Sequence, residues 1–343
     1  MIEVGIAGAS GYTGAELMRL LASHPEMRVR TVQAQSHAGA LVSDLYPSLA
    51  AAYPDMAYGP LAPEVLAQLD CVFLALPHGT SEAVAVSILG AGSWGGVLVD
   101  LSADFRLRDP VLYEKWYGRV HGAPDLLEGF AYGLPELNRE RLAETSLVAV
   151  PGCYPTAAIL AMLPFVEEGL AGDGPLIVDA TSGVSGAGRG LSDTTHFGSA
   201  NESFSAYSPL EHRHTPEMEQ ALGREVVFTP HLAPMSRGIL ATCHAELRIR
   251  EGFDTAAALE LMAKRYTCEP FVQVSEGLPG TKSVTGSNCA RLSARVGARS
   301  SQLVAFCAID NLVKGASGGA VQCANIALGL AEETGLPRAS VYP

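Results

Sequence analysis

A glycine-rich turn close to the start of the chain constrains the fold more than any other feature. The run GASGYTG at 8–14 follows a short apolar segment, Ile2 to Ala7, and precedes Ala15 to Ala22, where apolar residues recur on one helical face. A strand, a tight turn and a helix in this order open a βαβ unit, whose two strands run parallel. We therefore expect the chain to begin with a parallel sheet.

Later segments continue this alternation of strand and helix. The elements expected up to residue 150 are strands at 28–35, 71–76, 97–101 and 147–150 and a helix at 82–89. Alternating β and α elements are typical of a doubly wound parallel sheet, which binds ligands at the carboxyl ends of its strands. The predicted fold class is therefore α/β, with a Rossmann-like domain at 1–150.

The pattern after residue 150 predicts a second domain. Longer strands separated by polar loops indicate an α+β catalytic and substrate domain at 151–312. Near the end of the chain, apolar residues at helical spacing predict a helix within 313–343 that completes the first domain. A length of 343 residues agrees with about two domains.

Charge and cysteine usage narrow the expected partners and compartment. A net charge of −13 leaves no basic stripe for phosphates, so nucleic acid is not an expected partner. The 7 cysteines form no CxxC pair, which indicates thiols in a reducing compartment. We find neither a basic, apolar leader nor an apolar run near the roughly 20 residues of a membrane helix. We expect a soluble, cytoplasmic protein without a membrane partner.

Cys153 is the candidate nucleophile. It lies in the run PGCYPT at 151–156, between a predicted strand and a helix expected to begin near Thr156. The first N–H groups of a helix and the positive end of its dipole favour thiolate over thiol, which makes a cysteine nucleophilic. The alternative is a buried cysteine that only packs.

The glycine turn predicts a dinucleotide site, because the N–H groups of such a turn and the dipole of the following helix bind a pyrophosphate. A purely structural turn is the alternative. An NAD-specific site usually has an acidic residue after the second strand, but no carboxylate occurs between Glu26 and Asp44. The predicted cofactor is therefore NADP(H). The expected contacts are Gly8, Ser10, Gly11, Tyr12, Thr13, Gly14, Ser36 and His78.

The run EHRHTPE at 211–217 is the densest ionisable cluster and is expected on a loop that enters a helix, with Thr215 as its N-cap. His212 or His214 could accept the proton of Cys153 or donate one to a reaction oxygen, and Glu217 could orient the ring. A solvated loop and a zinc pair are the alternatives. No third metal ligand is evident, so no metal is predicted.

Three arginines are candidates for holding an anionic substrate. Arg106 follows a predicted strand, where its planar fork could bind a carboxylate or phosphate through two nitrogens. Arg189 ends the run SGVSGAGR at 182–189, whose Ser182, Ser185 and backbone N–H groups form a candidate anion cradle. Arg237 lies in the segment from His231 to Gly238, which is a third candidate for lining the substrate site. A surface salt bridge for Arg106 and a flexible linker at 182–189 are the alternatives.

Nine motifs in this order resemble the N-acetyl-γ-glutamyl-phosphate reductases, the arginine-pathway family of the semialdehyde dehydrogenase group. The resemblance spans the chain from Gly8 to about Leu330. The motifs are GASGYTG at 8–14, ALPHG at 75–79, DLSADFR at 100–106, PGCYPT at 151–156, SGVSGAGR at 182–189, HRHTPE at 212–217, PMSRGIL at 234–240, GSN at 286–288 and DNLVKGASG at 310–318.

The resemblance implies reduction of a small anionic acyl phosphate, N-acetyl-glutamyl phosphate, to a semialdehyde by NADPH. It implies that Cys153 forms a thioester and that one histidine of the pair His212 and His214 serves as acid and base, with His214 favoured but His212 left open. It also implies that Arg106 and Arg189 hold the substrate, with Arg237 as a further candidate. It also implies cofactor contacts by Gly183, Asn311 and Lys314 and a homo-oligomer, either a dimer or a tetramer. His37 stands after Ser36 where the family commonly has arginine, so we expect this chain to bind the 2′-phosphate of the cofactor through different residues or more weakly.

Two alternatives remain open from the sequence. One is the lysine-pathway homologue that acts on a carrier-bound aminoadipyl phosphate, with aspartate-semialdehyde dehydrogenase as a more distant relative of the same kind. The other, from a different class, is a cysteine acyltransferase or hydrolase, which would use Cys153 and a histidine without needing the glycine turn.

Overall fold

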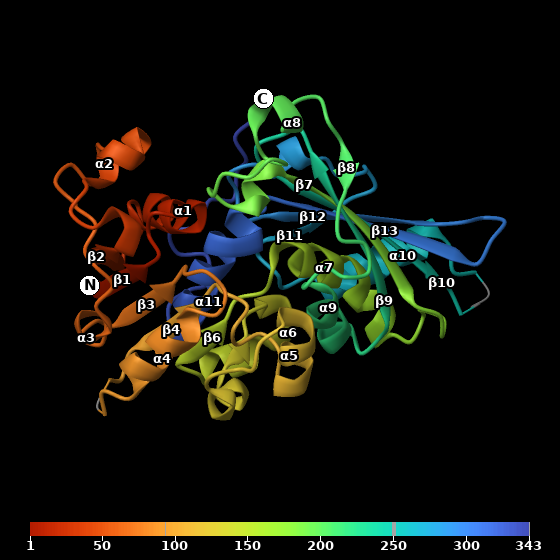
Figure 1. Ribbon diagram of the computed structural model, residues 1–343. Helices are drawn as coiled ribbons and strands as arrows, with labels where there is room; N and C mark the ends of the chain where they lie inside the picture. The colour runs from red at the N-terminus through yellow and green to blue at the C-terminus, as the bar shows by residue number, and fades with distance from the viewer. Residues whose placement is uncertain (93, 249–251, 343) are drawn as a thin grey trace. The chain divides into compact units, whose positions relative to one another are not determined.

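A computed structural model describes residues 1–92, 94–248 and 252–342. The chain divides into two units. Unit 1 contains Met1–Pro151 and Ala316–Leu336, and unit 2 contains Gly152–Gly315 and the residues from Pro337 onward. Unit 1 is therefore built from two separate stretches of chain, which are coloured red to yellow-green and blue in Figure 1.

Unit 1 is built on a parallel sheet, which confirms the predicted fold class. Its order is β2-β1-β3-β4-β6-β5, and every pair in it is parallel. The strands are β1 (Ile2–Ala7), β2 (Met27–Gln33), β3 (Cys71–Leu74), β4 (Val97–Asp100), β5 (Ala131–Tyr132) and β6 (Leu147–Ala149). All residues of β3 and β4 are buried, as expected of strands covered on both faces. Strand order reverses at β1, so the glycine turn lies at the switch point where such sheets bind ligands.

The helices of unit 1 are α1 (Tyr12–Leu21), α2 (Val42–Leu45), α3 (Pro63–Leu66), α4 (Ser81–Leu89), α5 (Pro110–Tyr117), α6 (Pro135–Ala143) and α11 (Gly318–Ala327). The residues of α11 from Gly318 to Asn325 are all buried, and the helix packs against α6 and β4. Its small residues permit this close approach.

The helix predicted within 313–343 is shorter than the apolar pattern suggested. A π-helix, Val313–Ser317, precedes α11, and the helix ends before Gly329, whose φ of +72° only glycine adopts readily. The residues from Pro337 return to unit 2, where the N–H of Val341 bonds to the carbonyl of Thr285. Pro343 lies outside the described residues.

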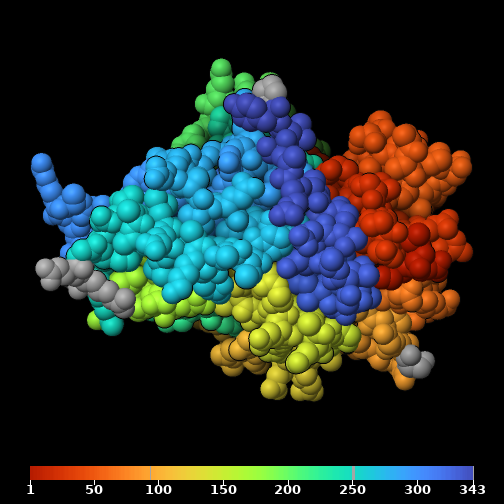
Figure 2. Space-filling view, turned by 180° about the vertical axis from the view of Figure 1, so that it is seen from behind, coloured from red at the N-terminus to blue at the C-terminus, as the bar shows by residue number. Residues whose placement is uncertain are grey.

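Unit 2 contains a mixed sheet of order β11-β12-β13-β10-β7-β9-β8. Its strands are β7 (Leu176–Gly183), β8 (Ser205–Ala206), β9 (Val226–Ala233), β10 (Ile239–Glu246), β11 (Val272–Val274), β12 (Ala290–Val296) and β13 (Gln302–Ile309). Its helices are α7 (Cys153–Glu167), α8 (Phe197–Ala200), α9 (Thr215–Leu222) and α10 (Thr255–Arg265). The turn between β12 and β13 projects from this unit (Figure 2).

Helix α7 forms the centre of unit 2. Its residues from Tyr154 to Phe165 are all buried, and it packs against β10, β13 and α9. The helix begins at Cys153, three residues earlier than the sequence suggested. Pro155 is compatible with this start, because the first turn of a helix does not need the N–H that proline lacks. Within the described part of the chain, no helix is long and apolar enough to cross a membrane.

Candidate active site

Cys153 is the first residue of α7, with Gly152 in extended conformation as its N-cap. The thiol therefore lies at the positive end of a helix of 15 residues, where the dipole favours the thiolate. All seven cysteines are thiols, and Cys153 is partly exposed. Cys71 and Cys243, by contrast, are fully enclosed, and burial raises their pKa. Cys153 thus combines access with a position that favours the reactive form.

A carboxylate and an imidazole hold the backbone just before Cys153. The N–H of Gly152 donates to Glu217 Oε1 at 2.7 Å and to Oε2 at 3.3 Å, and Glu217 is 2% exposed. A Cβ on Gly152 would lie 2.5 Å from Nε2 of His214, so the imidazole lies directly against the glycine. The orientation of a histidine ring by Glu217 stays a prediction; the structure adds that this carboxylate holds the N-cap of the nucleophile's helix.

His214 and His212 have different surroundings. Helix α9 begins at Thr215, so His214 takes the N-cap position expected for Thr215. The N–H of His214 donates to Nδ1 of His212 at 3.1 Å, and the two rings are 4.7 Å apart. Burial, with the charge of Arg213 in addition, lowers the pKa of His212 to about 4. His212 is therefore neutral near pH 7, with Nδ1 as acceptor and its proton on Nε2.

Two tyrosines adjoin this pair, and sequence reasoning assigned neither of them a role. The hydroxyl of Tyr207 donates to that of Tyr154 at 3.0 Å, which donates to the carbonyl of His231 at 3.1 Å. Both rings pack against His212, each with its centroid 5.6 Å away. Burial raises the pKa of both, that of Tyr207 to about 12. Tyr154 could have been found from the sequence because it follows Cys153 in PGCYPT. Tyr207 is 53 residues away from Tyr154, so no local pattern indicates it.

The predicted anion cradle is tied to the end of β13. Asn311 Nδ2 donates to Ser185 Oγ at 2.9 Å, and Asn311 Oδ1 accepts from the N–H of Gly238 at 2.7 Å. The hydroxyl of Ser182 donates to the carbonyl of Gly183 at 3.0 Å. A Cβ on Gly183 would lie 2.8 Å from the carbonyl oxygen of Met235, so this close approach requires glycine. The cradle and the loop at 235–238 therefore form one connected structure.

The predicted cationic residues of unit 2 differ in exposure. Arg189 is exposed. The side chain of Arg237 is 29% exposed, and its Nη1 lies 3.7 Å from Asp310 Oδ2. Lys314 is only 2% exposed, with its Nζ 6.0 Å from the centre of the Phe271 ring. Of these three side chains, Arg189 and Arg237 are therefore more exposed than Lys314.

The glycine turn of unit 1 has the shape of a phosphate cradle. Gly8 has a φ of +83°, and a Cβ there would collide with the carbonyl oxygen of Ala75. A Cβ on Gly14 would lie 2.5 Å from the Cα of Ala9. Gly11 is the N-cap of α1 and has room around it, so the N–H groups at the start of that helix can approach a ligand. These residues fit the pyrophosphate of a dinucleotide.

The other turn residues are braced from neighbouring segments. Tyr46 donates to the carbonyl of Ser10 at 2.9 Å, and Ser317 donates to that of Thr13 at 2.8 Å. Tyr12 is exposed. After β2, the Ser36 hydroxyl is exposed and bonds to Nδ1 of His37 at 2.8 Å. The segment between the end of β2 and Asp44 contains no carboxylate that would repel a 2′-phosphate.

Two further predicted residues of unit 1 have structural partners. Nδ1 of His78 accepts from the N–H of Ala103 at 3.0 Å. Arg106 is 6% exposed; its Nε donates to the carbonyl of Val150 at 2.7 Å and its Nη2 to that of Leu101 at 2.9 Å. The sequence suggested an accessible fork, but two nitrogens of Arg106 tie together the segments that follow β4 and β6. Backbone carbonyls as partners leave no mark in the sequence.

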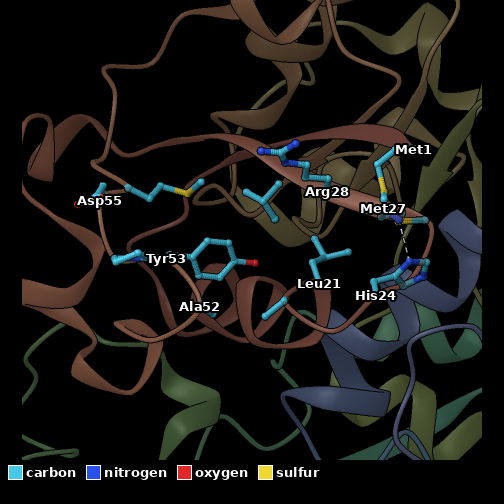
Figure 3. A pocket seen from close by; sticks show the side chains of 12 residues that line it. Met1, Leu21, His24, Met27, Arg28, Ala52, Tyr53 and Asp55 are labelled. Carbon is cyan, nitrogen blue, oxygen red and sulfur yellow. Dashed lines mark hydrogen bonds between the residues drawn. The ribbon is translucent and has the colours of Figure 1, made fainter.

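A pocket of about 510 Å³ lies at another place in unit 1. Its lining includes Leu21, Met27, Arg28 and Tyr53, and the ring of Tyr53 points into it (Figure 3). None of the predicted site residues lines this pocket. The Tyr53 hydroxyl has an internal partner, since it donates to the carbonyl of Met18 at 2.9 Å. Over the described residues, no group of three His, Cys, Asp or Glu is placed to hold a metal ion.

Two family models match the chain. One, described as "Semialdehyde dehydrogenase, NAD binding domain", matches residues 3–145, and "Semialdehyde dehydrogenase, dimerisation domain" matches residues 153–311. Similar curated proteins include the N-acetyl-gamma-glutamyl-phosphate reductases of Pseudomonas syringae pv. syringae, 48% identical over all of both chains, and of Symbiobacterium thermophilum, 49% identical over 100% of this chain and 99% of that one.

Solved structures show the same fold. Aspartate semialdehyde dehydrogenase II from Vibrio cholerae superposes with a TM-score of 0.71 at 17% identity, covering 96% of this chain and 99% of that one. Aspartate semialdehyde dehydrogenase with NADP from Candida albicans gives 0.68 at 15% identity, covering 95% and 98%. At this identity the likeness concerns the fold alone.

Proposed function

The chain belongs to the semialdehyde dehydrogenase family, and we propose that it reduces N-acetyl-L-glutamyl 5-phosphate to N-acetyl-L-glutamate 5-semialdehyde and phosphate. Full-length identity of 48% to curated reductases of that name supports the substrate and product. The observation that carries the chemistry is the position of Cys153 at the start of α7, with His214 against Gly152. A thiol there can carry an acyl group between two steps.

In the first step the Cys153 thiolate attacks the acyl carbon. The bond from that carbon to the phosphate oxygen breaks, phosphate leaves, and a thioester remains on Cys153. NADPH, when bound at the glycine turn, supplies the hydride that reduces this carbonyl carbon. The carbon–sulfur bond then breaks, which releases the semialdehyde and restores the thiolate. The thioester matters because it accepts a hydride far more readily than a resonance-stabilised carboxylate does.

We assign the proton transfers to His214. Its ring lies against Gly152, one residue from the nucleophile, whereas His212 has a pKa of about 4 and accepts a backbone hydrogen bond through Nδ1. A base that is to take the thiol proton and return it near pH 7 needs a pKa close to that value. His212 is too weak a base and is instead the support of His214. Glu217 fixes the cap of α7 through the N–H of Gly152.

The substrate's anionic groups need cationic partners, and we propose Arg189 and Arg237 for them, with Ser182 and Ser185 shaping the cradle. Both arginines retain exposure, and a guanidinium binds phosphate or carboxylate through two nitrogens. Arg106 contributes through its two carbonyl partners, which hold the carboxyl edge of the parallel sheet.

The cofactor is NADP(H). We propose that the backbone at Gly8, Gly11 and Gly14 binds its pyrophosphate. The lack of room for a Cβ at Gly8 and Gly14 supports this proposal. Ser10, Tyr12 and Thr13 complete this turn, and Ser36 with His37 takes the 2′-phosphate where an NAD enzyme would have a carboxylate. His78, Gly183, Asn311 and Lys314 complete the proposed cofactor contacts.

We also propose a homo-oligomer that pairs through the sheet of unit 2. One matching family model is a dimerisation domain, and it covers this sheet. On the face opposite to the buried residues, Ile177, Leu240, Val304 and Phe306 are at least partly exposed. These apolar side chains share the face with Thr242 and His244, and a second copy would cover them together. Sedimentation equilibrium should give a dimer or a tetramer, and a monomer at micromolar concentration would refute the pairing.

Replacing Cys153 by alanine tests the chemistry. Cys153→Ala should abolish phosphate-dependent oxidation of N-acetyl-glutamate semialdehyde with NADP, while NADPH binding, measured by fluorescence titration, stays nearly unchanged. Cys268→Ala, at an exposed thiol elsewhere in unit 2, is the matched control and should keep full turnover. Substantial turnover by Cys153→Ala would refute the thioester route. Because the thiol must stay reduced, we place the enzyme in a reducing compartment such as the cytoplasm.

A further inference from the structure

Asp310 joins several segments of unit 2 through one buried carboxylate. It directly follows β13 and is 0% exposed. Its Oδ2 accepts from the N–H of Gly286 at 2.7 Å, and its Oδ1 accepts from those of Leu312 at 2.8 Å and Val313 at 3.1 Å. Nη1 of Arg237 lies 3.7 Å from Oδ2. The carboxylate thus connects the GSN loop, the start of the π-helix and a proposed substrate-binding arginine.

The π-helix that Asp310 caps packs directly against Cys153. The N–H of Gly315 bonds to the carbonyl of Asp310 at 3.0 Å, a five-residue step that gives the π-helix its wide turn. A Cβ on Gly315 would lie 2.8 Å from the Cβ of Cys153 and 3.2 Å from the Cδ1 of Ile309. The backbone of Gly315 therefore lies directly against the nucleophile, and its position determines where the thiol can lie.

We propose that Asp310 is a positioning residue for the reaction, which sets the place of Cys153 through Gly315 and the direction of Arg237 through charge. The inference rests on the proposed function, since it takes Cys153 as the nucleophile. A carboxylate suits the task because it offers acceptors on two oxygens and because negative charge is favourable at the first N–H groups of a helix. No other residue type of this size could serve both sides.

Asp310→Asn is the informative change because it preserves size while replacing one oxygen by an NH₂ group. That donor must face either the N–H of Gly286 and the guanidinium of Arg237, or the N–H groups of Leu312 and Val313. In either orientation two donors meet, and one side of the junction loosens. Gly315→Ala tests the same contact from the other end, because the added Cβ presses on Cys153.

The measurement is the rate at which iodoacetamide alkylates Cys153 as a function of pH, followed by mass spectrometry of the peptide. This readout needs neither substrate nor cofactor, and the exposed Cys268 in the same sample is the internal reference. We expect Asp310→Asn and Gly315→Ala each to slow alkylation of Cys153 about tenfold relative to Cys268 and to shift its pH midpoint. Misplacement of the nucleophile should also lower kcat about 10²-fold. Asp310→Asn should raise KM as well, through Arg237, whereas Gly315→Ala should not.

Two variants in the same unit serve as matched controls. Asp254→Asn repeats the chemical change at the cap of α10, where the Asp254 side chain accepts from the N–H of Ala257 at 3.0 Å. Gly277→Ala adds a Cβ where nothing lies within 4 Å. Both should alkylate and turn over like the unchanged protein.

The outcomes separate this inference from the proposed function. Unchanged alkylation of Cys153 in Asp310→Asn and Gly315→Ala would overturn the inference. This holds even if the variants unfold at a lower temperature, because a purely structural role of Asp310 would lower the thermal midpoint without changing the alkylation rate. If Asp310→Asn does not fold, Gly315→Ala decides by the same measurement. Retained turnover in Cys153→Ala would instead refute the proposed function, whatever the alkylation rates show.

Discussion

The neutral state of His212 leads to a prediction about stability as well as catalysis. The ring is enclosed by Tyr154, Tyr207 and Phe228, and its pKa falls from 6.5 to about 4. Between these values the unfolded chain binds a proton that the folded chain does not, so stability rises with pH there. Read in the other direction, folding free energy is lost as the pH falls through 6.5 toward 4. His212→Asn removes this titration and keeps an acceptor for the N–H of His214.

The size of the effect follows from the shift. A full separation of 6.5 and about 4 corresponds to about 2 kcal/mol of lost stability at pH 5 relative to pH 8. The ring retains some exposure, so solvent screening reduces this figure to about 1–2 kcal/mol. Asp100, whose pKa burial raises to about 6, acts in the opposite sense, because its folded form binds the extra proton. Asp100 is present in both the unchanged protein and His212→Asn, so the difference between these two proteins does not contain its contribution.

Urea unfolding at pH 8 and pH 5, for the unchanged protein and for His212→Asn, measures the difference directly. Relative to the unchanged protein, the variant should gain about 1–2 kcal/mol on going from pH 8 to pH 5. Its kcat should fall only a few-fold, because the His214 backbone keeps its partner, whereas His214→Asn should fall about 10²-fold or more as the proton carrier is lost. If the two unfolding profiles are parallel in pH, His212 titrates normally and its assignment as a neutral support is wrong.

Two further predictions concern the cofactor. Gly14→Ala should weaken NADPH binding strongly, because its Cβ would lie 2.5 Å from the Cα of Ala9, while iodoacetamide labelling of Cys153 stays unchanged; normal NADPH affinity in a fluorescence titration would contradict the cradle. Ser36→Glu should reverse the preference from NADPH toward NADH, because a carboxylate there repels the 2′-phosphate and accepts from the ribose hydroxyl; a variant that still prefers NADPH in competition titrations would show that the phosphate is held elsewhere.

The parts of the fold that follow from local patterning could be predicted. The glycine turn, with a strand before it and a helix after it, is a short-range signal, and the parallel sheet of unit 1 follows from it. Element boundaries were less accurate where a proline is involved. The helix was expected to start near Thr156, but Cys153 is the first residue of α7, because the first turn of a helix tolerates Pro155.

The candidate site was predictable as a set of residue types and not as a set of contacts. Glu217 and Gly152 are 65 residues apart in the sequence, and a hydrogen bond to a backbone N–H leaves no trace in residue identity. The same holds for the carbonyl partners of Arg106. Gly315 was one glycine in a recognised motif, and only the packed structure shows that its missing side chain makes room for the nucleophile.

The division of unit 1 into two stretches has a consequence for synthesis on the ribosome. A nascent chain that has emerged as far as residue 315 contains nearly all of unit 2 but lacks α11, whose buried residues pack against α6 and β4. Contacts between such distant segments cannot form until both exist, and they close late and slowly. The amino-terminal unit, although translated first, therefore completes its core only when translation is almost finished.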